Sequence, residues 1–440
     1  MTQLEASIDI DDEHRGNINA MIDIEKLATS LDEELKSLHP LSDQYNSIYR
    51  VPKRLRELNE KAYTPQVVSI GPLHYGTEKL IPMEEHKRRY LQDFLRRTEA
   101  NIVDYVVIIK SNEVKLRSSY AEDIKLGSDE FVKMILVDAA FIIEILLKSK
   151  FKNLQNRNDR IFTKPWMIAD IMFDMCLLEN QLPFFILKEL GTILSMPSKD
   201  NNHPIINLIH DFTKDSWDFS KIEDSLENKS FERVEHLVDF LSICLVPSEK
   251  DMPKKTKLGT LTTPTVTELH QAGVKFQKAS YKGLFEIKFN NGSGILEIPH
   301  LKVVKETELL FRNLLAFEQC HGFTNCINDF VFLINHLVNT PKDVDLLIQF
   351  GIIENWLPDS VGVSTLFHNL VKETSIIPDN FYFSLLVEEM NRYCKTRWHR
   401  WKATLKQDYF RNPWTGISVF AAIVLLGLTF LQTLYSVLKK

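Results

Sequence analysis

Most of the chain carries apolar residues at three- and four-residue intervals, which is the period of an amphipathic α-helix. Leu27, Leu31 and Leu35 follow this spacing near the start. The same period runs from Pro82 to about Arg117, and it predicts one long helix there. Further helices are predicted at about 128–148, 166–194 with an interruption at 179–183, 203–215, 231–245, 307–319, 324–337, 344–350, 361–372 and from 380 onward.

The period changes to two after residue 267. Phe285, Ile287 and Phe289 alternate with Leu284, Glu286 and Lys288. Residues 290–294 are Asn, Gly and Ser, which favour a turn, and a mainly apolar run follows at 295–298. This pattern predicts a β-hairpin, with 274–277 as a third strand. The expected fold is mainly α: a multi-helix globular body with a small β-hairpin element and one C-terminal transmembrane helix.

The predicted transmembrane helix covers residues 412–438, which include no charged side chain and no His. At about 1.5 Å per residue, a helix of this length spans the roughly 30 Å of hydrocarbon in a bilayer. Ile417 and Leu434 bound its apolar centre, and Trp414 and Tyr435 lie near its ends, where aromatic rings favour the headgroup layer. We therefore expect the chain to be anchored in a lipid bilayer.

Basic residues gather before this segment, at Arg397, Arg400, Lys402, Lys406 and Arg411. Positively charged flanks remain in the cytosol. The chain starts with acidic residues and carries no apolar stretch of the kind that begins a signal peptide. These features predict a tail-anchored, single-pass protein of the plasma membrane or an endomembrane, with its body in the cytosol.

Changes in composition divide the chain into five parts. Residues 1–44 form an acidic segment with one helix, and 45–246 form the first part of a helical domain. Residues 247–267, rich in Lys, Thr and Pro, are expected to be a mobile linker or insertion. Residues 268–411 complete the domain with the hairpin and further helices, and 412–438 form the predicted anchor.

Composition and charge exclude some classes of protein. The net charge is -6, and the basic clusters are short and interleaved with other residues, so we expect no nucleic-acid partner. Five cysteines in 440 residues are too few and too scattered for a disulfide framework, and they suit a reducing compartment.

The chain contains none of the usual short catalytic motifs. It has no nucleophile elbow, no phosphate-binding glycine loop, no dinucleotide fingerprint and no zinc-protease helix motif. Cys320, His321 and Cys326 could contribute to a zinc site, but no paired Cys-x-x-Cys supports them, and core cysteines at a helix end explain them as well. We expect no cofactor and no metal.

Asp138 is a carboxylate on an otherwise apolar helix face, and Glu179, Asn180 and Gln181 interrupt a helix. Buried carboxylates acquire perturbed pKa values, so Asp138 and Glu179 are the sharpest acid/base candidates. The favoured interpretation is a structural network, in which these four side chains cap helix ends and satisfy buried backbone amides.

The stretch from Pro52 to Pro82 is rich in Pro and Gly, yet it also carries many Tyr, Val and Ile residues. It is expected to be an ordered loop packed on the core. Arg50, His74 and Tyr75 are its candidate partner-binding residues. An equally open alternative is that His74 and Tyr75 fix the loop to the core.

Several blocks of sequence stand out, at 48–52, 63–74, 83–91, 138–144, 178–185, 272–276, 312–320, 409–414 and 432–436. In sequence and in order these blocks closely resemble the plant domain-of-unknown-function 247 family. Ala139 departs from the Gly or Ser expected there. The resemblance implies a plant protein, generally with a C-terminal membrane segment, and some grass members resemble pollen-side determinants of self-incompatibility. It implies no catalytic residues.

The function expected from the sequence is a membrane-tethered plant interaction, signalling or recognition protein with unidentified protein partners and without evident catalysis. The alternative is a hydrolase-like enzyme with an unrecognised pocket that uses Asp138, Glu179 or His74.

Overall fold

The computed structural model describes residues 24–33, 35–36, 47–192, 204–217, 229–247, 252, 257, 259, 262–280, 283–322, 324–395 and 413–438. The chain divides into two units, Met1–Tyr45 and Asn46–Lys440. In the first unit residues 24–33 are helical, and the side chains of Ile24, Leu27 and Leu31 are exposed.

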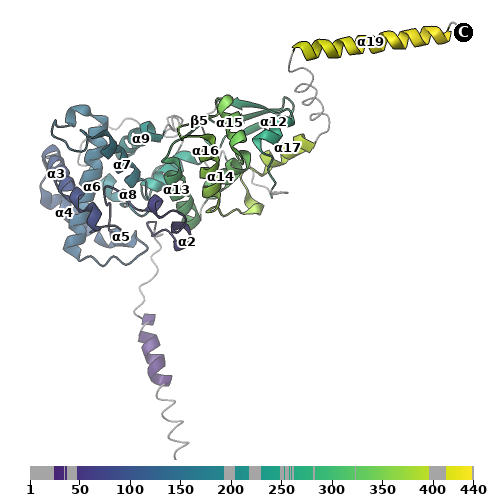
Figure 1. Cartoon of the computed structure of the whole chain (residues 1–440). Coiled ribbons are helices and arrows are strands. Elements are labelled where there is room, and N and C mark those ends of the chain that lie inside the picture. Colours follow the sequence, from purple (N-terminus) through teal and green to yellow (C-terminus); the bar gives the residue numbers. More distant parts are fainter. Residues whose placement is uncertain are drawn as a thin grey trace, which may run out of the picture. The chain divides into compact units, whose positions relative to one another are not determined.

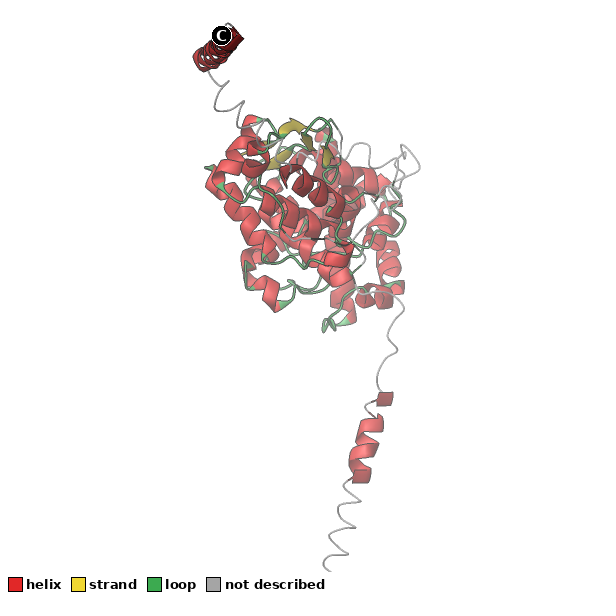
Figure 2. Ribbon diagram, turned by 90° about the vertical axis from the view of Figure 1, so that its right-hand side faces the viewer, coloured by secondary structure: helices red, strands yellow, loops and turns green. Residues whose placement is uncertain are grey.

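The second unit is mainly helical with small sheets (Figures 1 and 2). Its first helices are α2 (Lys53–Arg56), η1 (Glu60–Tyr63), η2 (Glu78–Leu80), α3 (Ile81–Thr98), α4 (Ile102–Ser111), α5 (Glu113–Ser118), α6 (Ser128–Lys150), η3 (Lys152–Leu154), α7 (Pro165–Met175), α8 (Phe184–Thr192), α9 (Pro204–Trp217) and α11 (Leu237–Leu245). The later helices are α12 (Val266–Gln271), α13 (Thr307–His321), α14 (Cys326–Leu337), α15 (Pro341–Gln349), α16 (Ser360–Val371), η4 (Pro378–Asn380), α17 (Ser384–Lys395) and α19 (Pro413–Leu438).

Helix α6 forms the centre of the first group of helices, where it packs against α3, α4, α8 and α9 (Figure 1). From Phe131 to Lys148, all of its side chains except Lys133 are buried. A helix that is apolar all round is a core helix. The charged side chains that it buries therefore need partners on the neighbouring elements.

The long helix predicted from Pro82 to Arg117 is instead three helices, α3, α4 and α5. Glu99 has a left-handed backbone with φ 52°, which ends α3, because a continuous helix cannot pass through that conformation. The Asn101 side chain then accepts a hydrogen bond from the Val103 N–H and starts α4. The apolar period continues across the break because α3 and α4 pack on the same helix α6.

Two small sheets lie among the later helices. Strands β1 (Lys275–Lys278), β3 (Ile295–Ile298) and β2 (Lys288–Asn290) form one sheet in that order. Strand β2 is antiparallel to β3, which confirms a hairpin there, although β2 begins at Lys288 rather than at Phe285. Strand β1 runs parallel to β3. Strands β4 (Leu301–Val303) and β5 (Ile353–Asn355) form a parallel pair that the sequence pattern did not predict.

The prediction of a C-terminal transmembrane helix is wrong on this structure. A helix is present, α19, but among the described residues no helix combines the length and apolarity needed to cross a membrane. The prediction gave most weight to missing charge over 412–438, which is a weaker condition than the sustained apolarity that a span needs. The side chains of Trp414 and Ile417 lie outside the described set, and those of Leu434 and Tyr435 are exposed.

Two other predicted segments differ from the structure. Helix α11 begins at Leu237 rather than at about residue 231, and the His236 side chain caps it by accepting the Asp239 N–H. The final helix of the body begins at Ser384 rather than at 380. Most of the expected linker at 247–267, and the segment 396–412, lie outside the described residues.

Candidate functional site

The interruption between α7 and α8 is stabilised by its own side chains. Gln181 Nε2 donates to the carbonyls of Met175 and Leu177, at 2.7 and 2.6 Å. Asn180 Nδ2 donates to the carbonyl of Asp174, at 2.9 Å. The last carbonyls of a helix have no partner within the helix. These two amides supply the missing donors and let the chain turn from α7 into α8.

The same turn, together with Asp138 of α6 and Asp174 of α7, binds the backbone of the loop at 66–71. Asn180 Oδ1 accepts the Ile70 N–H at 2.7 Å, and Asp138 Oδ2 accepts the Gly71 N–H at 2.8 Å. The Asp174 carboxylate accepts three consecutive N–H groups, those of residues 66–68, at 2.6–2.9 Å. Side-chain oxygens thus accept the backbone N–H groups of this loop, as the carbonyls of a neighbouring strand do in a sheet.

Asp138 is completely buried, and its other oxygen is paired with Lys87 of helix α3. Lys87 Nζ lies 2.5 Å from Asp138 Oδ1 and 2.9 Å from the Ser69 carbonyl oxygen. The Glu84 carboxylate also forms an ion pair with the Lys87 ammonium group. Burial raises the pKa of Asp138 to about 6, and the Lys87 ammonium group opposes this shift. Burial raises the pKa of Asp174 to about 6 as well, against the hydrogen bonds from residues 66–68.

Glu179 is also buried, and it lies against two arginines and a histidine. Its Oε1 accepts the Val51 N–H at 2.9 Å and Arg56 Nη1 at 2.7 Å. Its Oε2 lies 3.2 Å from His74 Nε2 and 3.6 Å from Arg50 Nη1. Burial alone raises the pKa of Glu179, but His74, Arg56 and the Val51 N–H more than offset that effect, so the pKa lies below its usual value.

The contact between His74 and Glu179 is close but poorly aligned. In the described part of the chain, neither His74 Nε2 nor Glu179 Oε2 makes a hydrogen bond of good geometry, although both are buried. The 3.2 Å separation is therefore an electrostatic contact between two incompletely satisfied groups. Such groups are uncommon in folded proteins.

The candidate partner-binding residues reach the surface to different extents. Arg50 is 44% exposed, and it bonds to the Leu73 carbonyl at 2.8 Å and to Glu122 at 3.1 Å. Tyr75 is partly buried. His74 is only 8% exposed, so it packs inside the loop. Arg50 and Tyr75 remain as groups that a partner can touch.

A second buried charge cluster, to which the sequence analysis gave no role, lies on α13. The Arg312 guanidinium pairs with Glu308 and Glu373, and the Tyr63 hydroxyl donates to Glu373 at 3.0 Å. Asn313 accepts the Leu178 N–H and donates to the Ala62 carbonyl. This cluster joins η1 and the turn before α8 to α13. The only sequence signal was the polar pair Arg312-Asn313 within an apolar helix.

The cysteines considered for zinc do not come together around a common point. Cys320 is exposed at the end of α13, whereas Cys326 is buried at the start of α14. His321 stacks on Phe317, with ring centroids 4.8 Å apart. Over the described residues, His, Cys, Asp and Glu side chains form no group of three or more that could hold a metal ion.

Known proteins resemble this chain over most of its length. A family profile described as a plant protein of unknown function, domain-of-unknown-function 247, matches residues 48–428. A UPF0481 protein of Arabidopsis thaliana is 29% identical, over 89% of this chain and 86% of that protein. A putative UPF0481 protein of the same plant is 23% identical, over 92% of each. No solved structure matches. The chain belongs to the plant domain-of-unknown-function 247 family.

Proposed function

We propose that this chain is a plant recognition or signalling protein that acts by binding other proteins and catalyses no reaction. The observation that carries the proposal is where the buried carboxylates point. Asp138 and Asp174 direct oxygens to backbone N–H groups of the loop. A catalytic carboxylate instead needs an oxygen that faces its substrate.

The loop so positioned offers a surface for a partner. Arg50 and Glu122 form an ion pair at 3.0 Å with both side chains more than two-fifths exposed, and Tyr75 lies beside the buried His74. Arg50 lies beside this loop, because it bonds to the Leu73 carbonyl. Exposed charged groups held on a fixed surface favour specific association, because they give electrostatic complementarity without a large ordering cost. We define the partner surface as Arg50, Tyr75 and Glu122.

Proximity labelling in plant cells tests this function. Full-length chains fused to a labelling enzyme would be compared as wild type, Tyr75→Ala and Glu122→Lys, with Arg89→Glu as the matched control. Arg89 is exposed on α3, outside the partner surface. The proposal predicts that the first two variants lose a shared set of labelled proteins, which Arg89→Glu keeps. An unchanged set in all variants, each folded by circular dichroism, would contradict it.

A second function is favoured by one observation, the pair of His74 and Glu179. A histidine beside a buried carboxylate is an arrangement used by general bases. Glu179 also accepts from Val51 and Arg56, which suits a structural role better. Glu179→Gln separates the two ideas, because it removes the charge beside His74 and keeps the size of the side chain. Loss of the folded state supports the network's structural role, and a fold of wild-type stability with lost function in plants supports chemistry.

A further inference from the structure

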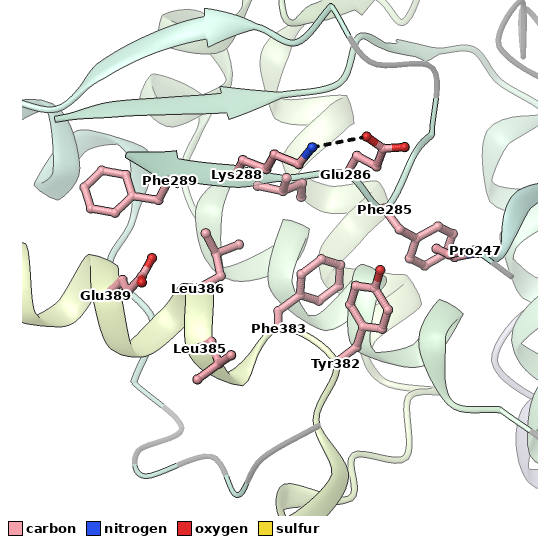
Figure 3. Close-up of a pocket in the computed structure, with 11 residues that line it drawn as sticks. Pro247, Phe285, Glu286, Lys288, Phe289, Tyr382, Phe383, Leu385, Leu386 and Glu389 are labelled. Carbon is pink, nitrogen blue, oxygen red and sulfur yellow. Dashed lines mark ion pairs between the residues drawn. The ribbon is translucent and has the colours of Figure 1, made fainter. Parts of the chain in front are cut away.

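The second unit contains a groove of about 670 Å³ between strand β2 and helix α17, away from the partner surface. Figure 3 shows Phe285 to Phe289 along one wall and Leu385, Leu386 and Glu389 on the helix opposite. Pockets of about 300–1,000 Å³ are of a size that binds ligands. Leu385 is 48% exposed, so this wall presents apolar surface to whatever enters.

Two aromatic contacts hold the walls of the groove together. Phe289 packs edge-on against Tyr393, with ring centroids 5.3 Å apart. Phe285 packs edge-on against Tyr382, with centroids 6.0 Å apart. Gly294, at φ +65°, leaves the space that the Tyr393 hydroxyl fills, since a Cβ there would lie 2.4 Å from it. The contacts preform the groove, which lowers the cost of binding.

Strand β2 is an edge strand of its sheet, because the strand order is β1-β3-β2 and β2 pairs with β3. On its other side lies the groove (Figure 3). By the register, Lys288 and Asn290 pair with β3, so within β2 the N–H and C=O of Phe289 face outward. An extended peptide can pair with such outward groups of an edge strand. Side chains of such a peptide alternate in direction, so every second one would enter the groove.

The charges in the groove select the kind of peptide. Its lining carries the carboxylates of Glu286 and Glu389 and one ammonium group, that of Lys288, which lies 3.5 Å from Glu286. The lining is therefore net negative. A basic side chain complements it.

We propose that this groove binds an extended, basic segment of a protein partner, which pairs with Phe289 at the outer edge of β2 and directs a Lys or Arg toward Glu389. The proposal rests on the proposed function, since it names the kind of partner segment bound. The groove proposal and the proposed function can fail separately. The groove test measures peptide binding to purified protein with variants on α17, whereas the test of the proposed function measures labelling in cells with variants of the partner surface.

The experiment is fluorescence anisotropy with purified full-length chain and a labelled peptide of alternating Val and Lys, seven residues long. The matched variants are Glu389→Lys, in the groove, and Glu388→Lys, one residue earlier on α17 and outside the lining. The proposal predicts binding that Glu389→Lys weakens by about tenfold or more and that Glu388→Lys changes by less than about threefold. The peptide with Glu in place of Lys should not bind.

Backbone methylation tests the strand addition itself. Two further peptides keep all side chains of the parent peptide. One carries N-methyl groups on its odd-numbered residues and the other on its even-numbered residues, so each lacks the backbone N–H donors along one edge of the extended peptide. Exactly one of the two should lose binding. The proposal is overturned if the Val-Lys peptide does not bind, if Glu389→Lys and Glu388→Lys weaken it equally, or if both methylated peptides bind as well as the parent.

Discussion

Lys87 Nζ lies 2.5 Å from Asp138 Oδ1, and both side chains are completely buried. The pair joins α3 to α6, and the other Asp138 oxygen holds the Gly71 N–H. Lys87 also binds the Ser69 carbonyl. This ion pair thus joins two helices to the loop at residues 69 and 71, while Asp174 and Asn180 hold residues 66–68 and 70. Buried side chains therefore position the loop that carries Tyr75, and Arg50 bonds to the Leu73 carbonyl of the same loop.

Removing the Lys87 ammonium group should lower the free energy of unfolding. Lys87→Met leaves the Asp138 carboxylate buried without its charge partner, and breaking one half of a buried pair typically costs about 3–5 kcal/mol of unfolding free energy. Urea unfolding measures this loss. Arg89→Met is the control, because its ion pair with Glu85 is exposed on both sides and should cost less than about 1 kcal/mol. Equal effects of the two changes would show that the buried pair does not stabilise the fold.

Gly71 and Gly76 form a matched pair for a second prediction. Both have positive φ, at +71° and +77°. A Cβ at residue 71 would lie 2.4 Å from the Gln181 carbonyl oxygen, whereas one at residue 76 meets nothing within 4 Å. Gly76→Ala should therefore cost only the left-handed backbone penalty, about 1 kcal/mol. Gly71→Ala should cost at least about 2 kcal/mol more, as measured by thermal or urea unfolding. Similar losses for both would mean that the loop does not lie closely against the Gln181 turn.

A third prediction concerns pH. His236 is fully buried. Its Nε2 lies 3.1 Å from the Ser47 carbonyl oxygen, and its Nδ1 accepts the Asp239 N–H. One donor and one acceptor nitrogen are what the neutral ring provides. Burial lowers its pKa from 6.5 to about 3. Between these values the unfolded chain binds a proton that the folded chain does not, so stability falls as pH falls. The slope is about 1.4 kcal/mol per pH unit.

The variant His236→Gln lacks this titration. Going from about pH 7.5 to about pH 5, wild type should lose about 2 kcal/mol more unfolding free energy than the variant. Asp239, whose pKa is raised to about 7 by burial, titrates in both proteins and so contributes little to the difference. Parallel pH profiles in urea unfolding would refute the neutral buried ring.

The sequence could predict those elements whose signal is local. Helix α6 follows apolar positions that recur at helical spacing from Phe131 to Leu147, and the β2–β3 hairpin has a turn rich in Asn and Gly. The break at Glu99 escaped prediction because the apolar period continues through it. Strands β4 and β5 are three residues each and lie some fifty positions apart along the chain, so no local pattern marks their pairing.

The candidate network could be predicted only in part. Asp138 was recognisable as a carboxylate within an apolar stripe, and 179–181 as polar residues where a helix stops. Their partners were not recognisable, because Lys87, Val51 and the amides of 66–71 lie far away in sequence and take part through the tertiary fold. Asp174 was missed because a carboxylate near a helix end is also common on solvent-exposed surfaces.

Hydrogen exchange of the loop tests most directly whether these buried side chains exist to hold residues 66–71. Full-length wild type and Asn180→Ala would be compared by mass spectrometry under native conditions. Loss of the Asn180 side chain leaves the Ile70 N–H and the Val68 carbonyl without their partner, so exchange across 66–71 should accelerate by about 10- to 100-fold, while peptides from α14 keep their protection. Unchanged exchange at 66–71 in a folded variant would contradict the structural role of the network.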